Sequence, residues 1–276
     1  MRLAGLDIGS TMTKALICDE EGKVLGSVIG PTGAQHRHLA LKVMTEVLDR
    51  TGLVLEALDF IVATGYGRIN VPFADKQITE ITCHARGIHA LFPSARTVID
   101  IGGQDSKGIK LDAAGKVVNF IMNDKCAAGT GRFLEVIADT LGIPLTEMGT
   151  LSLTAREAVP ISNTCTVFAE HEVTSRLAEG VGLPEIVAGL HAAIAGRVVN
   201  LVRTLGLQKD VAVTGGGAKN IGLVRAVEKQ VGFPVLVPDE PLLTGALGAA
   251  LLGRDFRTRG VVPKGERKLA GVTFYQ

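Results

Sequence analysis

The strongest constraint on the fold of this chain is an internal repeat. Residues 6–24 (LDIGSTMTKALICDEEGKV) and 99–117 (IDIGGQDSKGIKLDAAGKV) align without a gap at an offset of 93 positions. The eight identical pairs are turn and polar positions as well as aliphatic ones: Asp7/Asp100, Ile8/Ile101, Gly9/Gly102, Lys14/Lys107, Asp19/Asp112, Gly22/Gly115, Lys23/Lys116 and Val24/Val117. Similarity at a fixed offset indicates a duplicated supersecondary unit.

Each copy predicts a strand, a glycine turn, a second strand, an acidic turn with glycine, and a third strand. Hydrophobic periodicity after the copies predicts helices over 38–50, 78–91, 130–141, 167–179, 184–205, 219–231 and 242–252, and strands over 60–63 and 210–214. The fold class is therefore α/β with two similar halves. We expect a first lobe of residues 1–95 plus 243–276, in which the small-residue C-terminal helix packs back, and a second lobe of residues 96–242. The polar, basic tail 254–276 matches no pattern.

Composition excludes several classes of protein. The 276 residues carry 29 Lys and Arg against 28 Asp and Glu, so no basic footprint for nucleic acid or anionic membranes exists. Apolar stretches are short and broken by glycine, and Asp7 precedes any signal-peptide core. The four cysteines form no C-x-x-C pair, which argues against a disulfide framework or a single-chain zinc module. We expect a cytoplasmic protein with neither a nucleic-acid nor a membrane partner.

The duplicated glycine turns have the composition of phosphate-binding loops. Asp7 and Asp100 end a strand and precede turns with exposed backbone N–H groups, contributed by Gly9, Ser10 and Thr11 in one copy and Gly102, Gly103 and Gln104 in the other. Carboxylates there suit a hydrated Mg²⁺ that bridges phosphates. We expect Lys14 to neutralise terminal phosphate charge and Asp100 to orient the attacking water. Two tight hairpins with Asp as a turn former are the alternative, which duplication disfavours.

A third glycine cluster follows a buried strand in the second half. Gly215, Gly216 and Gly217, with Lys219 behind them, come directly before a predicted helix. Glycines let a ribose or a planar ring lie against the backbone at a helix start. One such cluster is weak evidence, but after two phosphate hairpins it completes a nucleotide site.

The ordered set LDIGSTMTK, VIDIGGQDSK and VTGGGAKN resembles the actin, hexokinase and heat-shock chaperone superfamily of ATPases over nearly the whole chain. The resemblance implies a duplicated ribonuclease-H-like, actin-type ATPase fold with two lobes around a nucleotide cleft. It also implies Mg-ATP binding and hydrolysis there. A small-molecule kinase with Asp100 as base shares this fold, whereas a chaperone-like or filament protein normally adds a large domain for which 276 residues leave no room.

Two cysteines have similar local contexts. Cys126 and Cys165 each precede a predicted helix, and a helix N-terminus favours thiolates and other anions. A [4Fe–4S] cluster needs four thiolates, so one cluster shared by two subunits would use both residues of each chain. We expect Gly129 and Gly131 to allow close approach to it. A shared zinc ion, or two small buried side chains, would also fit the spacing.

The segments NDKCAAGTGRFLE and ISNTCTVFAEHEV, with ATGYGR and ADKQ before them, closely resemble the activators of 2-hydroxyacyl-CoA dehydratases and the ATP-driven subunits of benzoyl-CoA reductases. The resemblance implies an oxygen-sensitive homodimer with one [4Fe–4S] cluster held by Cys126 and Cys165. It further implies that ferredoxin or flavodoxin supplies electrons and that ATP hydrolysis drives a low-potential electron into the dehydratase. An activator of another iron–sulfur reductase, of the benzoyl-CoA or double-cubane type, is the alternative partner assignment.

The remaining candidate residues have simpler expected roles. Cys18 and Cys83 fall on a predicted strand and helix and are expected in the core. His36 and His38 are expected on the solvated surface at a helix start, and Tyr66 and Arg68 are expected to line the cleft.

Overall fold

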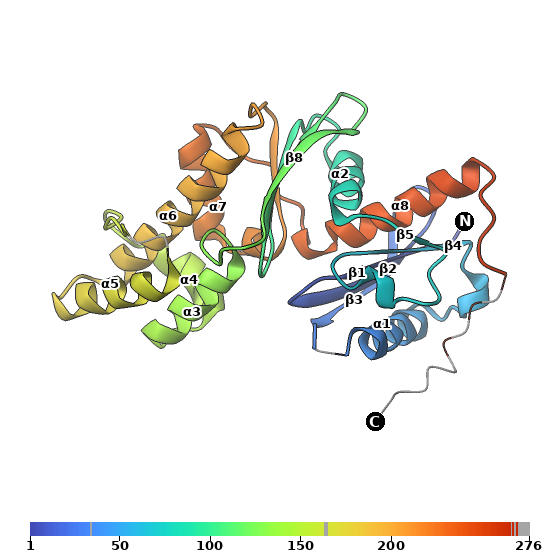
Figure 1. The fold of residues 1–276 in the computed structure, drawn as a ribbon, viewed down its shortest axis with the longest axis horizontal. Coiled ribbons are helices and arrows are strands. Elements are labelled where there is room, and N and C mark those ends of the chain that lie inside the picture. Colours follow the sequence, from blue (N-terminus) through green and yellow to red (C-terminus); the bar gives the residue numbers. More distant parts are fainter. Residues whose placement is uncertain (34, 163–164, 266, 268, 270–276) are drawn as a thin grey trace. The chain divides into compact units, whose positions relative to one another are not determined.

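The computed structural model describes the chain except for residue 34, residues 163–164, 266 and 268, and residues 270–276. The chain divides into two compact units. Unit 1 contains Met1–Pro93 and Leu242–Gln276, and unit 2 contains Ser94–Pro241. In Figure 1 the blue end of the chain and its red end therefore belong to the same unit.

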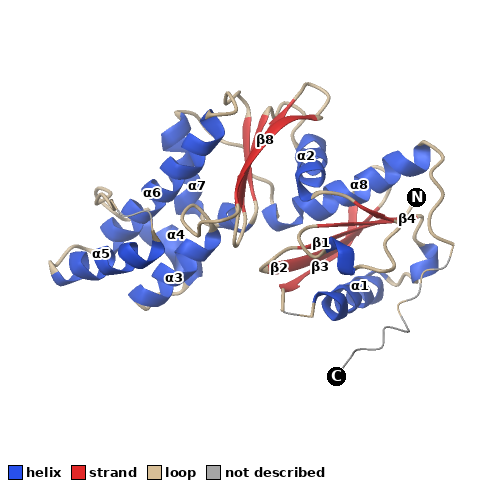
Figure 2. Ribbon diagram, viewed as in Figure 1, coloured by secondary structure: helices blue, strands red, loops and turns tan. Residues whose placement is uncertain are grey.

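Unit 1 is built on a five-stranded sheet in the order β3-β2-β1-β4-β5. Its strands are β1 (Leu3–Ile8), β2 (Met12–Cys18), β3 (Val24–Pro31), β4 (Phe60–Thr64) and β5 (Lys76–Gln77). The first three are antiparallel neighbours, and β4 runs parallel to β1. Helix α1 (His36–Thr51) covers one face of the sheet, whereas α2 (Glu80–Leu91) and α8 (Thr244–Thr258) cover the other (Figure 2).

Unit 2 repeats this plan with a four-stranded sheet in the order β8-β7-β6-β9. Its elements are β6 (Thr97–Ile101), β7 (Ser106–Leu111), β8 (Val117–Asn123), α3 (Gly131–Leu141), α4 (Leu145–Ser152), α5 (Thr166–Ala178), α6 (Leu183–Arg203), β9 (Val211–Thr214) and α7 (Ile221–Val231). By length and composition α6 could cross a bilayer, but its apolar residues are buried in the core of this unit.

Strand register confirms the repeat predicted from sequence. Asp7 pairs with Lys14 between β1 and β2, and Asp100 pairs with Lys107 between β6 and β7. The likeness continues past the aligned residues, since Thr64 of β4 lies beside Asp7 just as Thr214 of β9 lies beside Asp100. Within each unit, the end of the strand that carries the aspartate therefore lies beside the end of the strand that carries the threonine.

Helix α8 approaches its neighbours unusually closely through small residues. A Cβ atom on Gly5 of β1 would collide with the carbonyl oxygen of Ala246, and one on Gly87 of α2 would collide with that of Thr244. Gly248 of α8 is equally close to the carbonyl of Cys83. These glycines therefore let the backbone of α8 pack directly against the backbones of β1 and α2, which larger side chains would prevent.

The structure corrects several expected element boundaries. Helix α8 continues to Thr258 rather than ending near 252, because Phe256 packs on Phe60 and Asp255 pairs with Arg86. Helix α4 was not predicted, since its eight residues make little more than two turns, too few to establish a helical repeat. A short 3-10 turn over Gly216–Lys219 precedes α7, so this helix begins two residues later than expected.

A buried ion pair fastens the C-terminal tail to unit 1. Arg267 forms a salt bridge with Asp75, whose side chain is 1% exposed, and it also donates to the carbonyl of Leu58. Asp75 accepts further hydrogen bonds from the backbone N–H groups of Ile61 and Lys264, at 2.7 and 2.8 Å. The tail residues that showed no sequence pattern therefore include a specific anchor.

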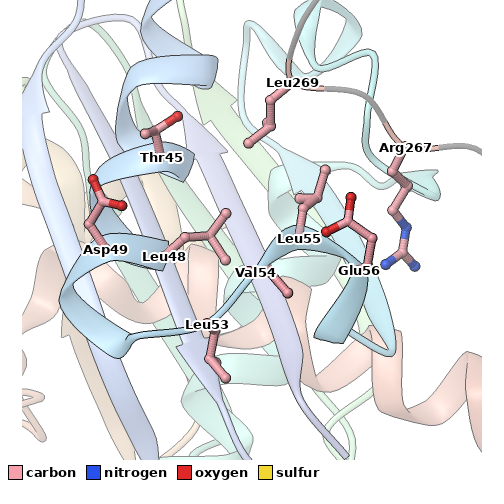
Figure 3. Close-up of a pocket in the computed structure, with 9 residues that line it drawn as sticks. All are labelled: Thr45, Leu48, Asp49, Leu53, Val54, Leu55, Glu56, Arg267 and Leu269. Carbon is pink, nitrogen blue, oxygen red and sulfur yellow. The ribbon is translucent and has the colours of Figure 1, made fainter.

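The anchor borders a shallow hollow of about 400 Å³ on unit 1 (Figure 3). Its walls come from the end of α1, the following loop and the tail: Thr45, Leu48, Asp49, Leu53, Val54, Leu55, Glu56, Arg267 and Leu269. It is mainly apolar and contains none of the residues expected to bind phosphate.

We expect Arg267→Ala to lower the free energy of unfolding by about 3 kcal/mol, because the Asp75 carboxylate would stay buried without its cationic partner. Urea unfolding of the full chain measures this change. Arg176→Ala is the matched control, since its i,i+3 pair with Glu179 is exposed and should contribute only about 0.2–0.5 kcal/mol. Equal losses in the two variants would contradict the proposed role of the buried pair.

Candidate functional site

The first hairpin holds a buried carboxylate beside a lysine. Asp7 is 4% exposed, and the Nζ of Lys14 donates to its Oδ2 at 3.0 Å. The turn between the strands closes with a hydrogen bond from the N–H of Gly9 to the carbonyl of Met12 at 3.1 Å. Ser10 and Thr11 at the tip are partly exposed, so their backbone N–H groups are accessible to an anion.

The second hairpin repeats this arrangement with one more acidic group. The Nζ of Lys107 lies 3.2 Å from Asp100 Oδ2 and 2.8 Å from Asp105 Oδ2, and Lys107 and Asp100 are each 4% exposed. Gly102 and Gly103 are partly exposed in the turn, and Gln104 is exposed at its tip. Sequence reasoning gave no role to Lys107 or Asp105, although the identity of Lys107 with Lys14 in the repeat was the signal that could have done so.

A glycine turn lies directly over each of the two carboxylates. A Cβ on Gly65 would collide with Asp7 Oδ1 and the carbonyl of Ile8, and one on Gly215 would collide with Asp100 Oδ1 and the carbonyl of Ile101. Both glycines have positive φ, of +85° and +81°. The segments Thr64–Gly67 (TGYG) and 214–217 (TGGG) are therefore structural counterparts, a relation the sequence alignment did not reach.

The expected nucleotide residues of unit 2 lie together in space. Asp100, Gly102 and Gly215 lie at the same end of the neighbouring strands β6 and β9, and Gly217 packs against Ile101. Lys219 is different, because its Nζ pairs with Glu240 at 3.0 Å and its side chain is half exposed. The structure therefore assigns Lys219 a surface ion pair at the edge of this group.

In unit 1 the Asp7 carboxylate has further polar neighbours. A Cβ on Gly245, at the start of α8, would lie only 3.0 Å from Asp7 Oδ2 and 3.1 Å from His84 Nε2. The glycine therefore leaves room for both side chains. His84 is buried, and its Nδ1 lies 3.2 Å from Thr244 Oγ1. His84 was not predicted as a site residue, since a single histidine in an apolar helix gives no specific signal.

Cys126 lies in a loop and not at the helix start that its sequence context suggested. Helix α3 begins at Gly131, and Gly129 with φ +89° turns the chain between the cysteine and the helix. The first N–H groups of α3 donate to the turn of the second hairpin: Gly131 N donates to Gly102 O at 2.8 Å, and Arg132 N to Gly103 O at 2.7 Å. A Cβ on Gly131 would crowd this junction, so Gly131 serves contact with the hairpin.

Cys165 is the N-cap residue of α5, as the sequence predicted, and it is exposed. The chain before it is fastened to the same helix, since Ser162 donates from both its backbone N and its Oγ to the carboxylate of Glu172 at 3.0 Å. Residues 163 and 164 lie outside the described part of the chain.

The other two cysteines are core residues, as expected. Cys18 on β2 and Cys83 on α2 are fully buried, and burial raises the pKa of each thiol to about 12. Cys126 is half-buried and Cys165 exposed, so these two are the accessible thiols. Among the described residues no group of three or more His, Cys, Asp or Glu side chains could hold a metal. The described part of one chain thus offers accessible thiols but no complete metal site.

Three further residues lie near the first hairpin, of which Tyr66 is exposed and His36 and Arg68 are partly buried. His36 begins α1 and lies edge-on to Tyr66, with ring centroids 6.2 Å apart, and Tyr66 is 74% exposed. Arg68 donates to the carbonyl of Gly65 at 3.0 Å, so it buttresses the glycine turn over Asp7.

We expect Gly215→Ala to abolish nucleotide binding, because the added methyl would displace Asp100 from beneath the glycine turn. Gly232→Ala is the control: its φ is +86°, but a Cβ there meets open space, so only backbone strain is added. Titration with a fluorescent ATP analogue should show binding in the control alone. Unchanged affinity in Gly215→Ala would contradict this placement.

The chain is similar to known proteins over more than nine tenths of its length. The chain is 47% identical over 260 residues to a 2-hydroxyisocaproyl-CoA dehydratase activator of Clostridioides difficile, covering 92% of this chain and 96% of that protein. It is 50% identical over 253 residues to an activator of lactoyl-CoA dehydratase of Anaerotignum propionicum, covering 91% and 96%.

A solved structure of the Clostridium difficile activator with bound ADPNP matches with a TM-score of 0.89 and 46% identity, covering 94% of this chain and 97% of that one. A ROK family glucokinase from Streptomyces griseus matches at 14% identity with a TM-score of 0.60, which shows a shared fold only. The fold is therefore of the actin and hexokinase type, as predicted. The model of one family matches residues 4–253, and the chain accordingly belongs to the BadF/BadG/BcrA/BcrD ATPase family.

Proposed function

We propose that this protein hydrolyses ATP to drive a low-potential electron into a 2-hydroxyacyl-CoA dehydratase-type partner. One observation carries the proposal. The turn of the second hairpin is hydrogen-bonded through the carbonyls of Gly102 and Gly103 to the first N–H groups of α3, and the loop that leads from β8 into α3 carries the accessible thiol of Cys126. A simple kinase has no use for accessible thiols joined to its phosphate turn.

The nucleotide residues act in two matched sets. Each set has a carboxylate suited to a hydrated Mg²⁺, Asp7 in one and Asp100 in the other, and the turns at Gly9 and Gly102 supply N–H donors for phosphate oxygens. Lys14, whose Nζ pairs with Asp7 at 3.0 Å, is the cation that neutralises charge on the terminal phosphates. Asp100, held beside Lys107, orients the water that attacks the terminal phosphate.

The donor set of each chain fits half of a metal centre. Thiolates are the ligands of iron–sulfur clusters, and Cys126 and Cys165 are the two accessible thiols, so a homodimer would supply the four that a [4Fe–4S] cluster needs. When bound, such a cluster supplies one-electron transfer at low potential. We propose ferredoxin or flavodoxin as the electron donor, oxygen sensitivity because of the cluster, and a cytoplasmic location.

The partner class rests on the relatives. The two relatives at 47% and 50% identity are named for the activation of 2-hydroxyisocaproyl-CoA and lactoyl-CoA dehydratases, so a dehydratase of that type is the first candidate partner. A benzoyl-CoA reductase-like or double-cubane reductase would require the same electron-driving function of this chain.

We expect Asp100→Asn to bind Mg-ATP but to hydrolyse it about 10²–10⁴-fold more slowly, as for loss of a general base. Folding should survive, because Lys107 keeps Asp105 as a partner at 2.8 Å. Phosphate release measures the rate. Asp112→Asn, in the distal turn of the same repeat, is the matched control, and hydrolysis at the wild-type rate in Asp100→Asn would remove this residue from the mechanism.

Anaerobically purified protein should carry about four irons per two chains. Cys126→Ser and Cys165→Ser should each abolish iron binding, whereas the buried Cys18→Ser and Cys83→Ser should retain it wherever they fold. Iron assay and light scattering measure the stoichiometry. Four irons per single chain, or zinc in their place, would falsify the shared-cluster assignment.

A further inference from the structure

Arg197 on α6 contacts the sulfur of one candidate ligand. Its Nη2 donates to Cys126 Sγ at 3.7 Å, and the two residues are 71 positions apart in the sequence. Both side chains are partly buried. Sequence reasoning gave Arg197 no role, because nothing in the α6 pattern distinguishes it from other polar positions of a core helix.

The loop around Cys126 is shaped to receive this arginine. Gly129 has φ +89°, and a Cβ there would lie only 3.3 Å from the Cδ of Arg197, so the glycine leaves room for the arginine stem. Asn123 Nδ2 donates to the carbonyls of Cys126 at 2.9 Å and Ala128 at 3.0 Å. The Oγ1 of Thr130 donates to Ala127 O at 2.7 Å. The loop therefore presents the sulfur in a defined direction.

Helix α6 is a rigid support for the guanidinium. His191, one and a half turns before Arg197, lies 2.9 Å from Ser152 Oγ through Nδ1 and 3.0 Å from Asn220 Nδ2 through Nε2. Burial lowers the pKa of His191 to about 4, so its ring is neutral at pH 7. The contact at 3.7 Å shows that Arg197 is a positive charge that this helix directs toward Cys126.

We propose that Arg197 positions the Cys126 thiolate and stabilises the reduced form of the metal centre that it ligates. The inference rests on the proposed function. Addition of one electron makes the ligated sulfur more negative, while the guanidinium keeps its proton and its charge throughout. A charged hydrogen-bond donor near the sulfur favours the more negative form, and donors to ligand atoms also fix ligand orientation. The arginine would thereby ease transfer from the electron donor.

The test is a redox titration of cluster-loaded, anaerobic wild-type protein and three variants. Electron paramagnetic resonance measures the fraction of the centre that is reduced at each potential. Arg197→Gln removes the charge, and Arg197→Lys keeps the charge without the planar fork. Arg203→Gln is the matched control, because Arg203 lies on the same helix but contacts Asn200 and the carbonyl of Gln230. Iron content and thermal unfolding are measured on the same samples.

In Arg197→Gln the ratio of reduced to oxidised centre at a fixed potential should fall about tenfold, which corresponds to a midpoint about 59 mV lower. Arg197→Lys should lie between this value and wild type, and Arg203→Gln should match wild type. Loss of iron from folded Arg197→Gln alone would also support the positioning role. Equal iron and equal midpoints in all four proteins, or unfolding of both Arg197 variants, would overturn it.

Absence of any iron–sulfur centre from the wild-type protein is a separate outcome, since it would refute the proposed function itself. Presence of the centre with an unshifted midpoint in Arg197→Gln would leave the proposed function standing and refute only the role of Arg197.

Discussion

A buried aspartate–lysine pair at the base of each glycine turn is the interaction on which the candidate nucleotide site depends. Asp7 and Asp100 are almost fully buried, and a carboxylate removed from water is costly unless a cation and hydrogen-bond donors compensate it. Lys14 and Lys107 provide that cation from the adjacent strand, at the same register in both hairpins. The glycines that cover the two carboxylates cannot carry side chains, so the surrounding backbone is constrained as well.

The turn of the second hairpin is hydrogen-bonded to the start of a helix. The carbonyls of Gly102 and Gly103 accept hydrogen bonds from the first N–H groups of α3. The loop that carries Cys126 lies between the end of β8 and the start of the same helix. Two short hydrogen bonds, at 2.8 and 2.7 Å, therefore join this turn to α3. Unit 1 carries no comparable thiol, because Cys18 and Cys83 are buried in its core. The duplicated fold has thus been specialised in one half.

The sequence predicted the fold, and it named most residues of the candidate site, for identifiable reasons. The ungapped repeat, the glycine turns and the helical spacing are local patterns. The strands and helices predicted from them agree with those in the structure to within a few residues at most ends. Helix α4 and the extension of α8 were missed because their stability comes from tertiary contacts, such as Phe256 on Phe60, and not from periodicity. The position of Cys126 was also misjudged, since the turn at Gly129 separates it from α3.

By itself the sequence determined the duplicated architecture, the paired Asp and glycine turns, and the two cysteine contexts, because each depends on residues close together in the chain. Only the tertiary structure decided which residues meet across the chain: Asp75 with Arg267, Gly65 over Asp7, and Arg197 with Cys126. Such contacts join segments up to about two hundred positions apart, and no local pattern encodes them. The tertiary structure also decided which cysteines are accessible, because the burial of a thiol depends on how the chain packs and not on the spacing between cysteines.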